Sequence, residues 1–209
     1  MDLVKLVIFD LDGTLVDSDK TVIRLLNTIR EDLNLSALKL KDVSLYLSLG
    51  GEEMIKKTIA SDIDTKKYLD IFRKKYLEDS LEKENLFDGV INYLNYLKAK
   101  RIQMAVFTNK PKDLAYKTLK KHNIYNFFNY IITSDDVRLK KPAPDGCYKI
   151  IKLSSIPSEN IIMIGDSELD QKAASLASIN YMHHNVSSNS KFIDSKNTKV
   201  FKNFNDLID

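Results

Sequence analysis

The sequence predicts an α/β fold in which a parallel sheet forms the core and a helical cap is inserted near the N-terminus. Two observations carry this prediction. Short apolar runs that end in polar residues alternate with helical patterns along most of the chain, and one long stretch lacks any strand-like run. Such alternation is typical of parallel sheets covered by helices on both faces. For a chain of 209 residues we expect one core, at residues 1–16 and 87–209, and a cap at residues 17–86.

Four apolar runs predict the strands of the core, at residues 3–9, 103–107, 130–132 and 161–164. Each run is short and stops at polar residues, which is typical of strands buried on both faces. In open parallel sheets, ligands bind outside the carboxyl ends of the strands. The polar residues that follow the four runs are therefore expected to converge on one crevice.

Three helical patterns predict the cap, at residues 22–33, 52–60 and 66–81. In the third pattern Tyr68, Phe72 and Tyr76 recur at every fourth position, so they share one helix face, which we interpret as cap core. The charged residues of the cap are interpreted as solvated helix faces. The turn at residues 50–52 either lines the entrance to the site or only starts a helix, and both interpretations stay open.

The C-terminal part has a weaker pattern. A polar surface loop is expected at residues 185–190, followed by an apolar run at 199–201 and a short last helix near 204–208. We interpret the adjacent His183 and His184 as surface residues.

Composition and charge exclude several classes of function. The net charge of +3 is spread along the chain and forms no basic stripe, so nucleic acid is not an expected partner. Neither a signal peptide nor a membrane span is visible, and the single cysteine, Cys147, cannot form an intrachain disulfide, so we expect a cytoplasmic protein. The sequence does not distinguish a monomer from a homodimer. With no zinc-type histidine spacing, the chemistry is left to carboxylates, hydroxyls and lysines.

The turn after the first apolar run, Asp10-Leu11-Asp12-Gly13-Thr14, carries the strongest chemical signal. Two carboxylates two positions apart on a tight turn can face one site, and Gly13 allows a sharp bend with close approach to a ligand. One carboxylate can attack phosphorus while the other handles the proton. The alternative is an ordinary solvated turn, which does not require Asp10.

A second acidic turn follows the fourth run, in Gly165-Asp166-Ser167-Glu168-Leu169-Asp170. Crowded carboxylates of this kind suit Mg²⁺, a hard cation with oxygen ligands. The alternative is that Asp166 or Ser167 only caps the following helix. We expect Glu168 to point to solvent.

Two further residues can meet a phosphoryl group. Thr108 stands where the second run ends, and Lys141 lies in the rigid segment Lys141-Pro142-Ala143-Pro144-Asp145. Taken alone, Thr108 is an ordinary strand-end residue and Lys141 belongs to a surface lysine pair.

Taken in order, these motifs resemble the four motifs of the haloacid dehalogenase-like hydrolase superfamily. Within it, segments 10–18, 108–111 and 141–145 are most similar to the phosphoglycolate phosphatases. The resemblance covers nearly the whole chain. It implies a Rossmann-like core with a small helical cap, in agreement with the alternation of strands and helices described above.

The resemblance also implies roles for the motif residues. Asp10 would be the nucleophile and Asp12 the general acid and base. Thr108, Asn109 and Lys141 would bind the transferring phosphoryl group.

For the metal, the resemblance implies a Mg²⁺ ion held by Asp166, Asp10 and the main-chain carbonyl of Asp12. Asp170 would support the metal or Lys141. The chain departs from the family pattern at residues 177–178 and 181–184, where relatives usually carry glycine.

The expected function is thus Mg²⁺-dependent hydrolysis of a small phosphomonoester, phosphoglycolate-like or a sugar phosphate, through an aspartyl phosphate. One alternative is a sugar phosphomutase similar to β-phosphoglucomutase, since the core motifs are nearly the same; Thr108-Asn109-Lys110 resembles the phosphatases more closely. A more remote alternative is a non-catalytic phospho-acceptor module similar to a receiver domain.

Overall fold

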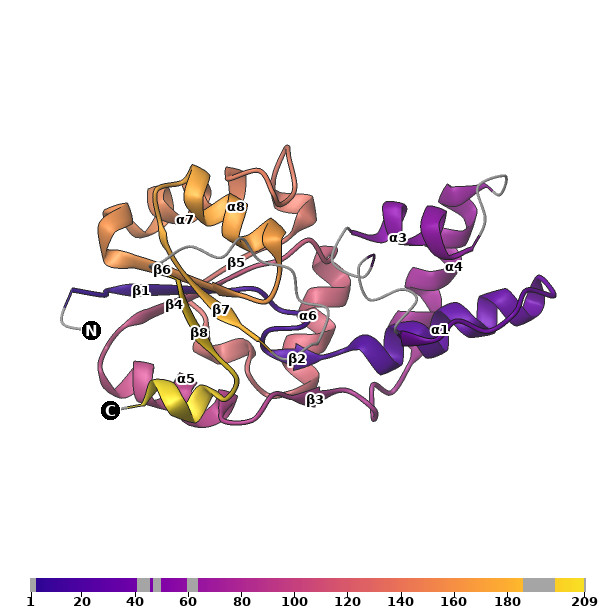
Figure 1. The fold of residues 1–209 in the computed structure, drawn as a ribbon, viewed down its shortest axis with the longest axis horizontal. Coiled ribbons are helices and arrows are strands. Elements are labelled where there is room, and N and C mark those ends of the chain that lie inside the picture. The colour runs from indigo at the N-terminus through magenta and orange to yellow at the C-terminus, as the bar shows by residue number, and fades with distance from the viewer. Residues whose placement is uncertain (1–2, 41–45, 47–49, 60–63, 186–197, 209) are drawn as a thin grey trace.

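The core of the protein is a six-stranded parallel sheet (Figure 1). The computed structural model describes residues 3–40, 46, 50–59, 64–185 and 198–208. The strand order is β5-β4-β1-β6-β7-β8. The strands are β1 (Leu6–Phe9), β4 (Gln103–Phe107), β5 (Tyr130–Ile132), β6 (Ile161–Gly165), β7 (Asn180–His184) and β8 (Lys199–Phe201). The predicted α/β class with a parallel sheet is therefore confirmed, and the four predicted strands are β1, β4, β5 and β6.

Helices cover both faces of the sheet because successive strand residues point to opposite sides. Val7 and Phe9 of β1 pack with α5 (Val90–Ala99) and α6 (Lys112–Lys121). Leu6 and Ile8 pack with α7 (Asp145–Ser154) and α8 (Glu168–Leu176). Short 3-10 helices are η1 (Tyr125–Phe127), η2 (Ser134–Asp136), η3 (Ser158–Asn160) and η4 (Phe204–Leu207).

The prediction that His183 and His184 lie on the surface is wrong, because both side chains are fully buried. They belong to β7, a strand that the sequence did not predict and that pairs on both sides, with β6 and β8. His184 packs on Phe201 and Phe204, with ring centroids 5.0 and 4.9 Å away. Burial lowers the pKa of both histidines to about 4, so both are neutral at physiological pH.

Three helices form a second cluster beyond the carboxyl end of β1, at the right of Figure 1. They are α1 (Asp19–Asp32), α3 (Gly51–Thr58) and α4 (Thr65–Glu78), close to the predicted bounds. Phe72 and Tyr76 are buried in this cluster and Tyr68 packs at its edge, so the aromatic face of α4 is cap core, as predicted. Residue 60, the expected last residue of the second cap helix, lies outside the described residues, as does most of the predicted loop at 185–190.

A short antiparallel pair joins the two clusters, formed by β2 (Val16–Asp17) and β3 (Asn85–Leu86). The expectation that the cap stretch, residues 17–86, contains no strand is therefore wrong at its two ends. A two-residue strand is too short to show an apolar pattern, and it forms here because the chain must leave and re-enter the core side by side. The division of the chain at residues 17 and 86 stays a prediction. In the part of the chain that the structure describes, no helix combines the length and apolar character needed to cross a membrane.

Candidate active site

The site forms where three adjacent strands end. β1 lies between β4 and β6, with Phe9 in register with Val106 and Ile164. The residues that follow these strands, Asp10, Thr108 and Asp166, are thereby brought to the same edge of the sheet. The main-chain N–H of Asp10 donates to the carbonyl of Ile164 at 2.9 Å, which continues the sheet pairing to the first site residue. This convergence is the one predicted for the strand ends.

Gly13 brings the first motif close to the fourth. Its φ of 82° lies in the left-handed region that glycine adopts without strain. A Cβ at this position would lie 2.4 Å from Oδ2 of Asp166, so a side chain cannot fit. The neighbouring Thr14 hydroxyl donates to Oδ1 of Asp166 at 3.0 Å. Glycine is thus needed here for both its backbone angle and its lack of a side chain.

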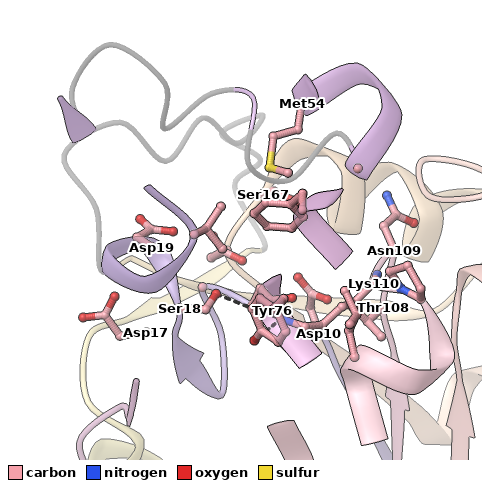
Figure 2. Close-up of a pocket in the computed structure, with 18 of the residues that line it drawn as sticks. Asp10, Asp17, Ser18, Asp19, Met54, Tyr76, Thr108, Asn109, Lys110 and Ser167 are labelled. Atoms are coloured by element: carbon pink, nitrogen blue, oxygen red, sulfur yellow. Dashed lines mark hydrogen bonds and ion pairs between the residues drawn. The ribbon is translucent and has the colours of Figure 1, made fainter. Parts of the chain in front are cut away.

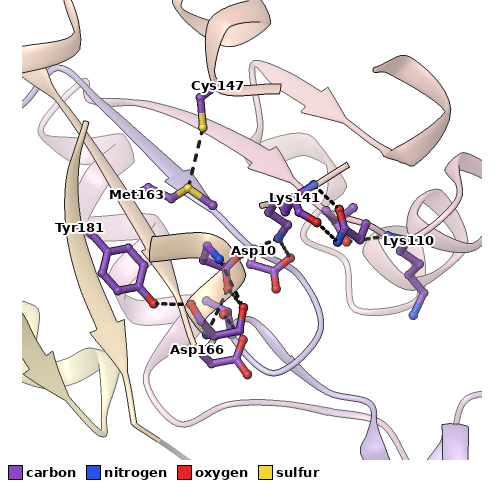
Figure 3. A network of polar contacts seen from close by, with 12 residues as sticks. Asp10, Lys110, Lys141, Cys147, Met163, Asp166 and Tyr181 are labelled. Carbon is purple, nitrogen blue, oxygen red and sulfur yellow. Dashed lines mark hydrogen bonds and ion pairs between the residues drawn. The ribbon is translucent and has the colours of Figure 1, made fainter. Parts of the chain in front are cut away.

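Lys141 lies at the centre of the buried part of the site (Figure 3). Its Nζ is 2.7 Å from Oδ1 of Asp10 and 2.6 Å from Oδ1 of Asp170. Burial alone would lower the pKa of Lys141, but the two carboxylates raise it, so the ammonium stays charged. Lys140 is exposed, and the alternative of a surface lysine pair is therefore excluded for Lys141.

Asp170 supports the site from the first turn of α8. Its Oδ2 accepts from both the main-chain N–H and the hydroxyl of Ser167, at 3.1 and 2.5 Å, while the Ser167 hydroxyl caps the helix. With Oδ1 on Lys141, both oxygens of Asp170 are occupied. The capping alternative therefore holds for Ser167, whereas Asp166 turns toward Asp10. Glu168 lies at the surface in an ion pair with Lys172.

The acidic groups at the strand ends fit a divalent cation. Carboxylate oxygens of Asp10, Asp166 and Asp170 all lie within 4.8 Å of one another. Burial, and then the charge of Asp170, raise the pKa of Asp10 to about 7 against the opposing effect of Lys141. Burial and the charges of Asp170 and Asp10 raise the pKa of Asp166 well above its usual value. Two mutually repelling carboxylates, one buried and one partly buried, are stabilised as anions by a hard cation such as Mg²⁺.

Thr108 and Asn109 lie together on the β4 side of the site. The Thr108 oxygen accepts from the main-chain N–H of Lys110 at 3.0 Å, so its hydroxyl hydrogen can be donated to a ligand. The Asn109 side chain instead makes paired hydrogen bonds with the main chain of Lys141, at 2.9 and 3.1 Å. Asn109 thus fixes the loop that presents Lys141.

The side chain of Asp12 turns away from the acidic cluster. Its Oδ1 accepts from the Ser18 hydroxyl at 2.6 Å and from Nζ of Lys110 at 2.8 Å. The described residues that could hold a cation with their side chains therefore include Asp10 and Asp166 but not Asp12. This fits the expectation that Asp12 would offer its main-chain carbonyl.

A cavity of about 560 Å³ lies between the strand ends and the cap cluster (Figure 2). Its floor includes Asp10, Thr108, Lys141 and Asp166, and the cap contributes residues of α1, α3 and α4. Gly51 of the turn at 50–52 both begins α3 and lines the cavity, so the two interpretations of that turn are compatible. The volume suits a small ligand.

Sequence reasoning missed three residues of the site, namely Ser18, Lys110 and Tyr76. Lys110 directly follows Thr108 and Asn109, and this proximity was a usable signal. Tyr76 has the same helical spacing as Phe72 and both line the cavity, so the spacing does not single out Tyr76 as the residue that contacts Lys110.

Comparisons with known proteins show the family of the chain. The model of the haloacid dehalogenase-like hydrolase family matches residues 7–183. The phosphoglycolate phosphatase of Pseudomonas syringae pv. tomato is 30% identical over 183 residues, which cover 84% of this chain and 67% of that protein. The phosphoglycolate phosphatase of Aquifex aeolicus is 30% identical over 173 residues, covering 83% and 81%.

A solved structure shares nearly the whole fold. It is that of a protein from Haemophilus somnus described as a predicted phosphoglycolate phosphatase, with a TM-score of 0.92, 25% sequence identity, and coverage of 99% of this chain and 97% of that one. The resemblance proposed from the sequence is confirmed: the protein belongs to the haloacid dehalogenase-like hydrolase family.

Proposed function

We propose that the protein is a Mg²⁺-dependent phosphatase that hydrolyses a small phosphomonoester through an aspartyl phosphate on Asp10. The observation that carries this proposal is the buried Asp10 carboxylate, paired with Lys141 and adjacent to Asp166 at the floor of a cavity. Membership of a hydrolase family and relatives that are phosphoglycolate phosphatases support the reaction class of phosphoric monoester hydrolysis.

In the first half-reaction, an Asp10 oxygen attacks phosphorus in line with the ester oxygen. The bond from Asp10 to phosphorus forms as the bond from phosphorus to the ester oxygen breaks, and Asp12 donates a proton to the leaving oxygen. In the second half, Asp12 takes a proton from water, and the water oxygen attacks phosphorus and displaces the Asp10 carboxylate. Inorganic phosphate leaves, and both aspartates return to their starting state.

The residues around Asp10 bind and orient the phosphoryl group. The Lys141 ammonium and the Thr108 hydroxyl offer positive charge and a hydrogen bond to its oxygens, in a site largely closed to water. Asn109 keeps Lys141 in place through the two main-chain hydrogen bonds. Asp170 holds Lys141 from the opposite side.

Asp10 and Asp166 would hold Mg²⁺, with the main-chain carbonyl of Asp12 as a further ligand, and Asp170 would support the site through Lys141 and Ser167. When bound, the ion supplies positive charge to the phosphoryl oxygens and favours the ionised form of Asp10. Because burial holds the pKa of Asp10 near 7 without a cation, that charge is needed for a fully ionised nucleophile at neutral pH.

The substrate class is small phosphorylated metabolites, phosphoglycolate-like or sugar phosphates. The cavity volume and the activity of the curated relatives support this class. A cytoplasmic location and the absence of nucleic-acid or membrane partners stay predictions.

The test is phosphate release from a panel of phosphoglycolate, sugar phosphates, nucleotides and pyrophosphate, with Mg²⁺ and with chelator. We expect hydrolysis of at least one small monoester, lost with chelator and lost in Asp10→Asn. Asp88→Asn, at an exposed carboxylate that does not line the cavity, is the matched control and keeps activity. Wild-type turnover in Asp10→Asn contradicts the proposal.

A further inference from the structure

Asp12 has two unequal oxygens. Oδ1 accepts two short hydrogen bonds, from the Ser18 hydroxyl at 2.6 Å and from Lys110 Nζ at 2.8 Å. Oδ2 has no hydrogen-bond partner within the described ranges, and the Asp12 side chain is 33% exposed where it lines the cavity. A half-turn of the carboxyl group would only exchange its two equivalent oxygens, so the donors distinguish two positions: the one named Oδ1, which Ser18 and Lys110 occupy, and the one named Oδ2.

Lys110 is itself held by a residue of the cap. Its side chain is 7% exposed, and its Nζ donates to the hydroxyl of Tyr76 at 2.7 Å and lies 4.3 Å from the centre of the Tyr76 ring. Burial alone would lower the pKa of Lys110, but Asp12 raises it, so the lysine stays a charged donor. The ammonium is therefore fixed between Asp12 in the core and Tyr76 in the cap.

Tyr76 is fixed in turn, because the last turn of α4 is anchored to α6. The Tyr76 hydroxyl donates to Oε1 of the buried Glu84 at 2.6 Å and lies 3.0 Å from the Thr118 hydroxyl. Lys117 of α6 donates to the main-chain carbonyls of Tyr76 and Leu77, which a helix leaves without partners at its C-terminus. The Tyr76 hydroxyl is thus a rigid point from which Lys110 is oriented.

We propose that Tyr76 is a positioning residue that acts through Lys110, and that Lys110 and Ser18 reserve Oδ1 of Asp12 so that Oδ2 alone carries the transferred proton. This inference rests on the proposed role of Asp12 as acid and base. A carboxyl oxygen that already accepts two hydrogen bonds is a poor site for a proton, whereas Oδ2 has no hydrogen-bond partner among the described residues and belongs to a side chain that lines the cavity. The acid and the base steps then use the same oxygen in the same position.

The two half-reactions respond differently to a displaced Asp12. The p-nitrophenolate group leaves without a proton, so transfer from p-nitrophenyl phosphate to Asp10 needs no acid. Hydrolysis of the aspartyl phosphate needs Asp12 as a base for every substrate. A displaced Asp12 therefore slows the second half selectively, and p-nitrophenolate appears as a rapid burst before slow turnover.

The experiment compares Tyr76→Phe and Lys110→Met with two controls, Tyr68→Phe on the same helix and the exposed Lys112→Met. Burst and steady-state rates are measured with p-nitrophenyl phosphate and Mg²⁺. We expect kcat to fall about 10-fold in Tyr76→Phe and about 100-fold in Lys110→Met, while the burst rate and kcat/KM stay unchanged, so that KM falls together with kcat. Both controls should match the wild type.

Two outcomes overturn the proposal. If the burst slows together with turnover, or KM rises strongly at constant kcat, Lys110 binds the phosphoryl group and does not position Asp12. If the variants only melt at a lower temperature and keep wild-type kinetics, the contacts are structural. Lys110→Arg, which keeps the charge, is the second variant should Lys110→Met fail to fold, and it should recover part of kcat. Failure of the proposed function itself is recognised separately, because wild-type turnover in Asp10→Asn leaves no aspartyl phosphate to analyse.

Discussion

Two lysine–carboxylate groups flank the floor of the cavity, and they differ in what holds them. The Lys141 group joins Asp10 and Asp170, with side chains 3%, 9% and 0% exposed, and every member belongs to the core. The Lys110 group joins Asp12 to Tyr76, so it spans the core and the cap, and Asp12 is one-third exposed. Both groups line the cavity, but the Lys141 group is almost closed to water and held within the core, whereas Asp12 of the Lys110 group is more exposed and the group depends on where the cap lies.

The difference matches the chemistry proposed for each group. A nucleophile and the cation beside it gain from exclusion of water, because electrostatic attraction to a phosphoryl group is stronger in a low-dielectric site. An acid that later becomes a base must exchange protons with the substrate and with water, so it must face the cavity. Asp10 and Asp12 belong to one short turn, but they differ in burial and in contact with the cap. This difference suits Asp10 to the role of nucleophile and Asp12 to the role of acid and base.

The largest effect is expected for Lys141→Met. Removing one partner of a buried ion pair leaves Asp10 and Asp170 uncompensated, which should destabilise the metal-free protein by about 3–5 kcal/mol. Loss of a phosphoryl-binding cation should also lower kcat about 1,000-fold. Chemical denaturation and phosphate release measure both effects, with the exposed Lys140→Met as control. If Lys141→Met is as stable as the control, the buried group is not the rigid element described here.

Asp166→Asn tests whether a cation binds beside the Lys141 group. A site filled to about 100 times its Kd stabilises the wild type by about 2.7 kcal/mol, and this gain should vanish in the variant. Without metal, the stability of the wild type should fall as pH rises from about 4 to 7. The reason is that the pKa of Asp10 is raised from 3.8 to about 7 in the folded state, so the folded state binds one more proton than the unfolded state in this range. Thermal melts between pH 5 and 8, with and without Mg²⁺, measure both trends. Equal Mg²⁺ stabilisation of variant and wild type contradicts the assignment.

The residues at the strand ends, Asp10, Thr108 and Asp166, were predictable from the sequence because the sheet alone brings them together. Each of these residues follows an apolar run that predicts a strand. Once the strands are inferred to be parallel, their carboxyl ends must lie at the same edge of the sheet, so the three residues are expected to lie close together. The loop that carries Lys141 could be placed only through its resemblance to a known motif. Its physical anchor, the paired hydrogen bonds with Asn109, is invisible in the sequence.

The second group could not be predicted, because it depends on contacts between distant parts of the chain. Tyr76 meets Lys110 only because α4 ends against α6, and that packing is a property of the folded cap. The prediction that His183 and His184 lie on the surface was wrong for a related reason. Their segment is polar, and only pairing of β7 with neighbours on both sides buries it.

Asp19→Asn probes the electrostatics beside the Lys110 group. Burial, followed by the charges of Asp17 and Asp12, raises the folded pKa of Asp19 from 3.8 to about 6, so its ionisation costs stability as pH rises through this range. The asparagine variant should be more stable than the wild type by about 1–2 kcal/mol at pH 7.5, which is less than full conversion of the shift because Asp19 is partly exposed. The difference should shrink toward pH 4.5 in urea denaturation. A difference that is constant with pH contradicts this origin.

The smallest effect is expected for Arg24→Met. The Arg24 guanidinium pairs with Asp79 at 2.6 Å, linking α1 to the end of α4, but the arginine side chain is 36% exposed and such pairs contribute about 0.2–1 kcal/mol. If the anchor on α6 positions Tyr76, loss of this pair should lower stability slightly and leave kcat unchanged. A fall in kcat as large as that of Tyr76→Phe would show that the packing of α1 on α4, and not the anchor on α6, sets the position of Asp12. The measurements are urea denaturation and steady-state kinetics of Arg24→Met, with Lys74→Met, which removes an exposed ion pair on α4, as the control. Together they decide which contact connects the cap to Asp12.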